Sequence, residues 1–504
     1  MSSVIDIKPT SPVYLRRKAS EFIVNVNPQY AGKTLTIDCD LEGADFEKVV
    51  VDIPEGGLKP GTCVSYNVGM TADPVLLSAD GTANTYIVNK ADCLYAFNAK
   101  VKGNGSTKSI SWSYDGEPHS TAFDAALAPS SAELLWYSIP EGEGGFVNAS
   151  PVSAGSVMYD DVDGLIYFKT PKTFVNGNAV IAALNESGEI VWSWNIWAVE
   201  GWDADATSRK AGRYTVMDRN LGAVISGVGS TGNYEPAYAV GNYYQWGRKD
   251  PFPSIADYCN YWPCEYANQL IGTPTYTPIV ALRVNGQSAA KNVDSQVWGY
   301  RTKDDGSFNM DSSWHTIERN SIAAPSSSNR VFAGYAVEHP YVYILNPTYP
   351  DGGYYPWLTT NDQSYREFWG GSESNKTLFD PCPTGWRVCN KAEAESFMQT
   401  VSSTAALASN LVGYDFDGHY LPMTGTRGNK NMRTTNVRSC GYETKSYMWT
   451  SEILTSHNYG YAYTAAMIAP ANYADAGKPN TLKMTTEGQD RYLTLACPVR
   501  CVKE

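Results

Sequence analysis

Side chains that could carry acid–base or nucleophilic chemistry are few in this chain of 504 residues, and they are scattered along it. No HExxH metal motif and no GxSxG nucleophile turn is present, although such motifs are what place reactive groups on one element. The five histidines show no clustering, and they are His119, His315, His339, His419 and His457. The sequence therefore favours a protein that is not an enzyme.

The cysteines do not form a metal-binding pattern. Structural zinc sites use CxxC pairs or Cys/His clusters at short spacing. The nearest approach is Cys259 and Cys264 in "YCNYWPCEY", which has no second pair of its kind. We therefore expect no zinc site. The ten cysteines are also too sparse for a disulfide scaffold, and they are Cys39, Cys63, Cys93, Cys259, Cys264, Cys382, Cys389, Cys440, Cys497 and Cys501.

Two acidic pairs are the remaining candidates for cation ligands. They are Asp415 and Asp417 in "YDFDGHY", and Asp304 and Asp305 in "KDDGSF". Carboxylates of this kind ligate hard cations such as calcium, but Asp followed by Gly is more often a plain turn. No motif supports calcium, so no cofactor is predicted.

The sequence offers a binding surface near its C-terminal end. The segment 446–480 mixes tyrosines with Ser, His and Asn, and recognition surfaces favour that mixture because rings supply contact area while short polar groups adapt their hydrogen bonds. Trp449 and about half of the tyrosines are expected in the core. The predicted ligand-binding residues are Tyr447, Ser456, His457, Asn458, Tyr459, Tyr461, Tyr463, Asn472 and Tyr473.

Charge and hydropathy exclude two classes of partner. The net charge of −13 repels phosphate backbones and anionic lipid, and no apolar stretch reaches the roughly 18 residues that a membrane span needs. We therefore expect no nucleic-acid partner and no membrane insertion. The start "MSSVIDIKPTSP" lacks the apolar stretch of a signal peptide, so export information either lies outside this sequence or is not needed for release from the cell.

Period-two alternation predicts strands in the first two blocks of the chain. Residues 1–72 contain "EFIVNV", "KTLTIDCDL" and "CVSYNVGM" and are expected to form a small antiparallel β domain. Residues 73–210 contain six more apolar runs, and a β-sandwich is the economical architecture for them. In the last run, Trp192, Trp194 and Ile196 share one face, and a hairpin turn is expected at Glu186 to Gly188.

Residues 211–504 have a different texture, with long loops rich in Asn, Gly, Ser and Tyr and only scattered strands. One helix start is clear, because Asn390 and Glu393 fit the N-cap and N3 positions of a capping box. The buried stripe of that helix is expected to contain Phe397, Met398 and Val401.

Six motifs in this last region occur in an order that resembles a known family. They are "VMDRNLGA", "GNYYQWGRKDPF", "LFDPCPTGWRVCNKAEAESF", "GHYLPMTGTRG", "YMWTSE" and "CPVRCV". Together they resemble the Fibrobacter major paralogous domain of Bacteroidetes surface proteins, a C-type-lectin-like fold in its formylglycine-generating-enzyme-like version. The two preceding blocks are similar to β domains of fimbrillin-like proteins. The family usually has Pro where Cys389 stands here.

The resemblance implies a mainly β multi-domain fold, with two β-sandwich-like domains followed by an α+β C-type-lectin-like domain with long ordered loops. It also implies that the Cys-Pro turn and the C-terminal strand approach each other, so that Cys382 and Cys501 form a disulfide. The calcium triplets of animal C-type lectins are absent, the nearest strings being Glu117-Pro118-His119 and Glu235-Pro236-Ala237.

The function that the resemblance implies is an extracellular adhesin of the fimbrial or pilus-tip type, located at the cell surface. Its partners would be a host or bacterial surface glycan or protein, and other pilus subunits. One alternative is a phage tail receptor-binding protein that contacts virion proteins, and another is an exported enzyme of formylglycine-type fold. In the family, a segment such as 456–475 can be varied by a diversity-generating retroelement.

Overall fold

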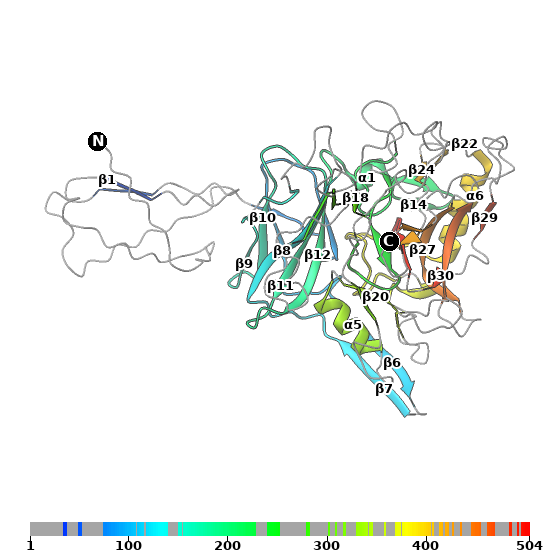
Figure 1. Ribbon diagram of the computed structural model, residues 1–504, viewed down its shortest axis with the longest axis horizontal. Coiled ribbons are helices and arrows are strands. Elements are labelled where there is room, and N and C mark those ends of the chain that lie inside the picture. The colour runs from blue at the N-terminus through cyan, green and yellow to red at the C-terminus, as the bar shows by residue number, and fades with distance from the viewer. Residues whose placement is uncertain are drawn as a thin grey trace.

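The architecture comes from a computed structural model, shown in Figure 1. It describes residues 34–37, 49–52, 74–106, 108–114, 117–139, 150–153, 155–227, 239–252, 279–282, 301–302, 308–309, 316–318, 329–340, 342–345, 357–358, 368–373, 375–404, 406–407, 413–416, 419–422, 426–427, 434–435, 445–454, 461–468, 483–485, 491–492 and 495–504. Strands predominate over helices in this part of the chain, which confirms the predicted mainly β fold.

Two sheets face each other, and all of their strands except β16 come from residues 75–198. The first has the order β3 (Val75–Leu76), β5 (Leu94–Asn98), β10 (Leu165–Lys169), β9 (Met158–Asp160). The second has the order β16 (Ile279–Leu282), β8 (Ser131–Ile139), β11 (Gly177–Leu184), β12 (Ile190–Ala198), β4 (Thr85–Val88). Phe97 of β5 packs against Trp194 of β12 at 5.0 Å between ring centroids, so the two sheets share a core.

The apolar runs of this block form strands where the alternation predicts them. All six correspond to β4, β5, β8, β10, β11 and β12, and Gly188 takes a left-handed conformation at the predicted hairpin turn. One feature differs from the alternation pattern, because β12 is buried on both faces. Trp192 and Trp194 face the shared core, while Ser193 on the other face contacts residues from the second half of the chain.

The last two strands, β31 and β32, belong to two further sheets. One has the order β13 (Arg209–Ala211), β14 (Tyr214–Val216), β32 (Cys501–Lys503), β21 (Trp386–Val388). The other has the order β15 (Tyr243–Gln245), β31 (Ala496–Pro498), β25 (Thr426–Arg427), β26 (Thr434–Thr435). The last strands therefore join segments that lie hundreds of residues apart in the sequence.

The predicted helix is present as α6 (Lys391–Thr404), and its capping box is complete. The Asn390 side chain accepts from the Glu393 backbone N–H at 2.8 Å, and the Glu393 carboxylate accepts from the Asn390 N–H at 2.8 Å. Phe397 is buried as predicted, whereas the side chains of Met398 and Val401 lie outside the described residues. Glu393 also pairs with Arg387 of β21, which fastens the helix start to the sheet.

The remaining elements are short, apart from the β27–β28 pair and the β6–β7 hairpin. Two helices, α1 (Ala204–Thr207) and α5 (Asn329–Glu338), and the 3₁₀ turn η3 (Gly371–Glu373) were not predicted from the sequence. In the described part of the chain, no helix has the length and apolar character needed to cross a membrane. The other strands are β1 (Thr34–Ile37), β2 (Val49–Asp52), β6 (Lys108–Tyr114), β7 (Glu117–Phe123), β17 (Arg301–Thr302), β18 (Phe308–Asn309), β19 (Thr316–Glu318), β20 (Tyr343–Leu345), β22 (Ala406–Leu407), β23 (Gly413–Phe416), β24 (His419–Pro422), β27 (Lys445–Leu454), β28 (Tyr461–Ile468), β29 (Lys483–Thr485) and β30 (Arg491–Tyr492).

A disulfide joins Cys382 to Cys501, as the resemblance implied, with a Cα–Cα distance of 6.0 Å and 119 positions between the two residues in sequence. A cross-link over a loop of this length constrains the unfolded chain strongly in the chain-entropy account. The double variant Cys382→Ala/Cys501→Ala is expected to lose about 2–5 kcal/mol of unfolding free energy, measured by urea denaturation.

The control is Cys93→Ala, which removes a cysteine that makes no disulfide and should change the free energy much less. Adding dithiothreitol should bring the wild type down to the level of the double variant and leave that variant unchanged. An equal effect of the reductant on both proteins would contradict the prediction.

Candidate functional site

The predicted ligand-binding segment is built around the antiparallel strands β27 and β28. Leu454 pairs with Tyr461, so residues 455–460 connect the two strands. In Figure 1, β27, β29 and β30 lie on the side of the molecule away from β8, β11 and β12. β27, which begins that segment, therefore lies away from the two facing sheets.

Tyr447 was predicted to bind ligand, and the structure corrects this prediction. Its side chain is 1% exposed and belongs to the hydrophobic core, as does that of Trp449 two positions later on the same face of β27. The Trp449 indole donates to the Tyr244 carbonyl at 2.7 Å, which anchors this strand inside the fold. In a strand, a tyrosine two positions from a core tryptophan points to the same face as the tryptophan. The prediction from residue composition did not use this spacing.

The other predicted ligand-binding residues are not tested by the described side chains. Tyr461 and Tyr463 lie on β28, where the structure describes the backbone only. The remaining predicted residues lie outside the described part of the chain, and they are Ser456, His457, Asn458, Tyr459, Asn472 and Tyr473.

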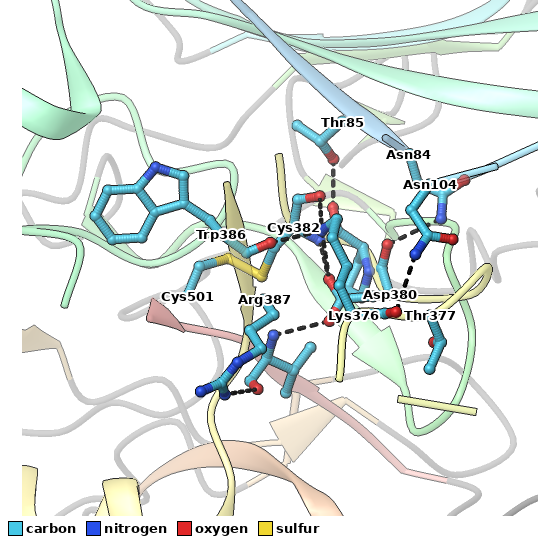
Figure 2. A network of polar contacts seen from close by, with 12 residues as sticks. Asn84, Thr85, Asn104, Lys376, Thr377, Asp380, Cys382, Trp386, Arg387 and Cys501 are labelled. Atoms are coloured by element: carbon cyan, nitrogen blue, oxygen red, sulfur yellow. Dashed lines mark hydrogen bonds and ion pairs between the residues drawn. A yellow bond between two sulfur atoms is a disulfide. The ribbon is translucent and has the colours of Figure 1, made fainter. Parts of the chain in front are cut away.

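The Cys-Pro turn is organised by a buried carboxylate, that of Asp380 (Figure 2). This carboxylate accepts hydrogen bonds from the backbone N–H groups of Cys382 at 2.8 Å and Val388 at 2.9 Å. The Lys376 ammonium lies 3.1 Å away and also donates to the carbonyls of Cys382 and Trp386. A buried charge is tolerated only when it is paired and fully hydrogen-bonded, and this turn supplies all of those partners.

Cys389, which stands where the family that the sequence resembles usually has Pro, is accommodated within the turn. Its thiol is buried and lies 3.7 Å from the Trp449 carbonyl, and its own carbonyl accepts from the Ser451 N–H at 2.8 Å. Burial raises the pKa of the Cys389 thiol well above its usual value. The thiol therefore stays neutral and acts as a small packing group.

The same turn docks against the sheets of residues 75–198 (Figure 2). The Asn84 amide donates to the carbonyls of Leu378 and Asp380, both at 2.8 Å, and the Thr85 hydroxyl donates to the Pro381 carbonyl at 2.7 Å. Gly103 has a φ of +47°, and a Cβ at that position would lie 2.2 Å from the Leu378 carbonyl oxygen. The two halves of the chain, residues 73–210 and residues 211–504, therefore meet here through closely approaching backbone groups.

A second contact between the halves is a buried cluster of Ser193, Lys249 and Asp250. The Lys249 ammonium donates to the Asp250 carboxylate at 2.5 Å, to the Ser193 hydroxyl at 2.6 Å and to the Ser193 carbonyl at 3.0 Å. The Ser193 hydroxyl donates to Asp250 at 2.6 Å. The ammonium also lies 4.4 Å from the centroid of the Trp192 ring, where a desolvated cation is attracted by the ring.

A serine beside a lysine is a pattern that nucleophilic catalysis uses, but the contacts of this cluster are those of a structural ion pair. Each of the three ammonium hydrogens of Lys249 has an acceptor, so no lone pair is directed at the Ser193 hydroxyl. Ser193 is 1% exposed, so its hydroxyl is not open to solvent. Burial lowers the pKa of Lys249 to about 8, and the Asp250 charge opposes that change.

Arg248, from the same motif "WGRKD", holds the end of α5 within the second half of the chain. Its guanidinium donates to the Val342 carbonyl at 2.6 Å and to the Pro340 carbonyl at 3.2 Å, directly after α5. It also reaches the carbonyls of Ala336 and His339 at 3.3 Å, and basic side chains at a helix C-terminus satisfy carbonyls in this way. Three consecutive charged residues stand between Trp246 and Phe252 in the sequence. They could have indicated a buried polar contact, but the sequence analysis did not use them.

Among the described residues, no group of three or more His, Cys, Asp or Glu side chains could hold a metal ion. The side chains of Asp304, Asp305, Asp415 and Asp417 lie outside that part of the chain. No family model, curated protein or solved structure matches this chain.

The Lys249–Asp250 pair can be tested by removing one charge or both. Lys249→Met leaves the Asp250 carboxylate buried without its ammonium, and breaking a buried pair in this way costs about 3–5 kcal/mol. Lys249→Met/Asp250→Leu removes both charges and should lose less stability than Lys249→Met alone. Urea unfolding followed by tryptophan fluorescence measures the difference, and a double variant less stable than the single one would refute the assignment.

The pH dependence of stability gives an independent check on the burial of Lys249. Its folded pKa of about 8 lies below the ordinary value of 10.5, so between these pH values the unfolded chain holds a proton that the folded chain has released. Stability from this group therefore rises with pH across that window. Relative to Lys249→Met/Asp250→Leu, the wild type should gain up to about 3 kcal/mol between pH 8 and 10. A difference that stays constant would mean that Lys249 is solvated.

Proposed function

We propose that this protein is an extracellular adhesin, a subunit of the fimbrial tip type, that binds a glycan or a protein on another cell surface. In this proposal residues 73–210 form a β-sandwich-like domain that follows a smaller fimbrillin-like domain in residues 1–72. Residues 211–504 form a C-type-lectin-like domain that contacts the receptor. The described residues support the proposal through one observation, the anchoring of the β27–β28 pair.

The β27–β28 pair has buried side chains on β27, and the connection between its two strands is rich in residue types that recognition surfaces favour. Trp449 and Tyr447 are buried in the core, and the Trp246 indole donates to the Thr450 carbonyl at 2.8 Å from the opposite side. The connection that leaves this anchored strand carries Ser456, His457, Asn458 and Tyr459. A rigid base lowers the entropy cost of holding such side chains in a binding arrangement.

A second feature suits a protein that must transmit force between its receptor and its anchor. The two halves of the chain share one hydrophobic core cluster, and the hydrogen bonds of Asn84 and Thr85 cross their boundary. Relative motion of domains is the default where interfaces are small and polar. Here the shared hydrophobic core favours the transmission of load as a single body.

The receptor surface is tested with Tyr459→Ala/Tyr461→Ala in the full chain. Binding on glycan and cell-surface arrays is expected to be abolished, because the aromatic anchors of an interface carry most of its binding energy. The melting temperature is expected to stay at the wild-type value. Tyr447→Ala is the matched control, since the loss of a buried ring costs about 3–5 kcal/mol and lowers the melting temperature.

Two outcomes would count against the proposal. A double variant that melts as early as Tyr447→Ala would place the two rings in the core. A double variant with unchanged melting and unchanged binding would show that receptor recognition lies elsewhere.

A further inference from the structure

The end of α5 is held by a buried cation, Arg248. This residue is 2% exposed, and its guanidinium donates to four backbone carbonyls around the end of the helix and to the Gln245 side chain. The Asp250 carboxylate attracts Arg248 but forms its ion pair with Lys249. Tyr343 on β20 is a further neighbour, and burial lowers the pKa of Arg248 to about 10. Arg248 is therefore still charged at neutral pH, although in the described part of the chain its Nε–H has no acceptor.

The imidazole of His339 lies directly after α5 in one fixed tautomer. Its Nδ1 is 3.0 Å from the Tyr335 carbonyl oxygen, and because a carbonyl only accepts hydrogen bonds, Nδ1 carries a hydrogen. The ring stacks on the Tyr335 ring, with 4.0 Å between centroids and 11° between planes. The His339 carbonyl in turn accepts from Arg248 at 3.3 Å. A further proton would therefore enter at Nε2, on a residue that Arg248 already contacts.

Several groups around His339 decide whether that proton is accepted. Burial lowers the pKa of His339, the hydrogen bond to the Tyr335 carbonyl opposes this, and the Arg248 charge adds to the lowering. Two further groups face this end of α5. Burial raises the pKa of Tyr335, and burial together with Glu189 of the β11–β12 hairpin raises the pKa of Glu338. The folded imidazole is therefore neutral at pH values where an unfolded histidine already takes up a proton.

The packing of α5 against the segment that contains Arg248 is incomplete. A cavity lies between them, lined in part by residues 247–250 and by Ala333, Ala336 and Val337 of α5. Side chains that border a cavity lose contacts on that side, and Gly334 weakens the helix itself. The hydrogen bonds of Arg248 therefore carry much of the attachment at this end of α5.

We propose that α5 is an acid-sensitive clasp at the boundary between the two halves of the chain, and that protonation of His339 loosens the end of the helix from Arg248. The imidazolium places a second positive charge beside a buried guanidinium and also carries its own cost of desolvation. Since α5 lies against β12 of the first half, its loosening weakens the contact between the halves. The clasp does not depend on the receptor surface proposed on the β27–β28 pair.

The expected pH window follows from the two states of His339. The unfolded imidazole takes up a proton near its ordinary pKa of about 6.5, and the folded one does so at lower pH. The stability that neutral His339 contributes is therefore complete above about pH 6.5 and is lost as the pH falls toward the folded pKa. Glu338 acts in the opposite sense, because its raised pKa lets the folded chain take up a proton first. A loosening in acid therefore points to His339 and not to Glu338.

The experiment follows amide hydrogen exchange of the full chain at pH 7.5 and pH 5.0, with rates corrected for the intrinsic pH dependence of exchange. The amides of α5 are expected to lose protection by about threefold or more at pH 5.0, and those of α6 to keep theirs. His339→Gln keeps a neutral N–H donor and cannot become charged, so its α5 should be equally protected at both pH values. Glu338→Gln is the matched control, and it should lose protection in acid as the wild type does.

Two results would overturn the proposal. They are equal protection of α5 in the wild type at both pH values, and the same acid-induced loss in His339→Gln as in the wild type. If α5 of His339→Gln is already unprotected at pH 7.5, an NMR titration of the His339 imidazole in the wild type decides. Protonation at or above pH 6.5 would then refute the clasp, and protonation at clearly lower pH would support it.

Discussion

The burial of charge at the boundary between the two halves of the chain is the constraint on which the rest of the structure depends. Asp380 and Lys249 have almost no exposed surface, and a charge in that position must be surrounded by partners of fixed geometry. The partners of Asp380 come from its own turn, and those of Lys249 include Ser193 on β12. The contacts of Lys249 with Ser193 therefore help to fix how the second half sits against the first.

This constraint gives a structural role to the charged groups in two motifs of the second half. "WGRKD" and "DPCPTGW" each place ionic or polar groups where backbone segments must approach one another closely. Buried polar networks specify a unique arrangement when every member is satisfied. Such motifs hold a scaffold and the surface that it carries in one fixed arrangement.

The sequence predicted local structure well and the contacts between distant segments poorly. The capping residues Asn390 and Glu393 predict α6 because the hydrogen bonds between them join residues that lie within four positions of each other in the sequence. Alternation puts Ser193 on the face of β12 opposite Trp192 and Trp194, but period two does not distinguish a solvent-facing side from a polar interior. Tyr447 looked like a surface ring for a similar reason, because composition does not report which face a side chain takes. The Cys382–Cys501 pair came from a family resemblance, and no spacing rule would have singled it out.

The position of β31 and β32 late in the sequence has a consequence for folding. Tyr244 of β15 pairs with Cys497, and Val216 of β14 pairs with Val502. Strands that are synthesised early therefore pair with strands that are synthesised much later. A ribosome adds on the order of 5–20 residues per second, which leaves those edges unpaired for many seconds. The sheets of the second half therefore close only after residues 496–503 have been synthesised.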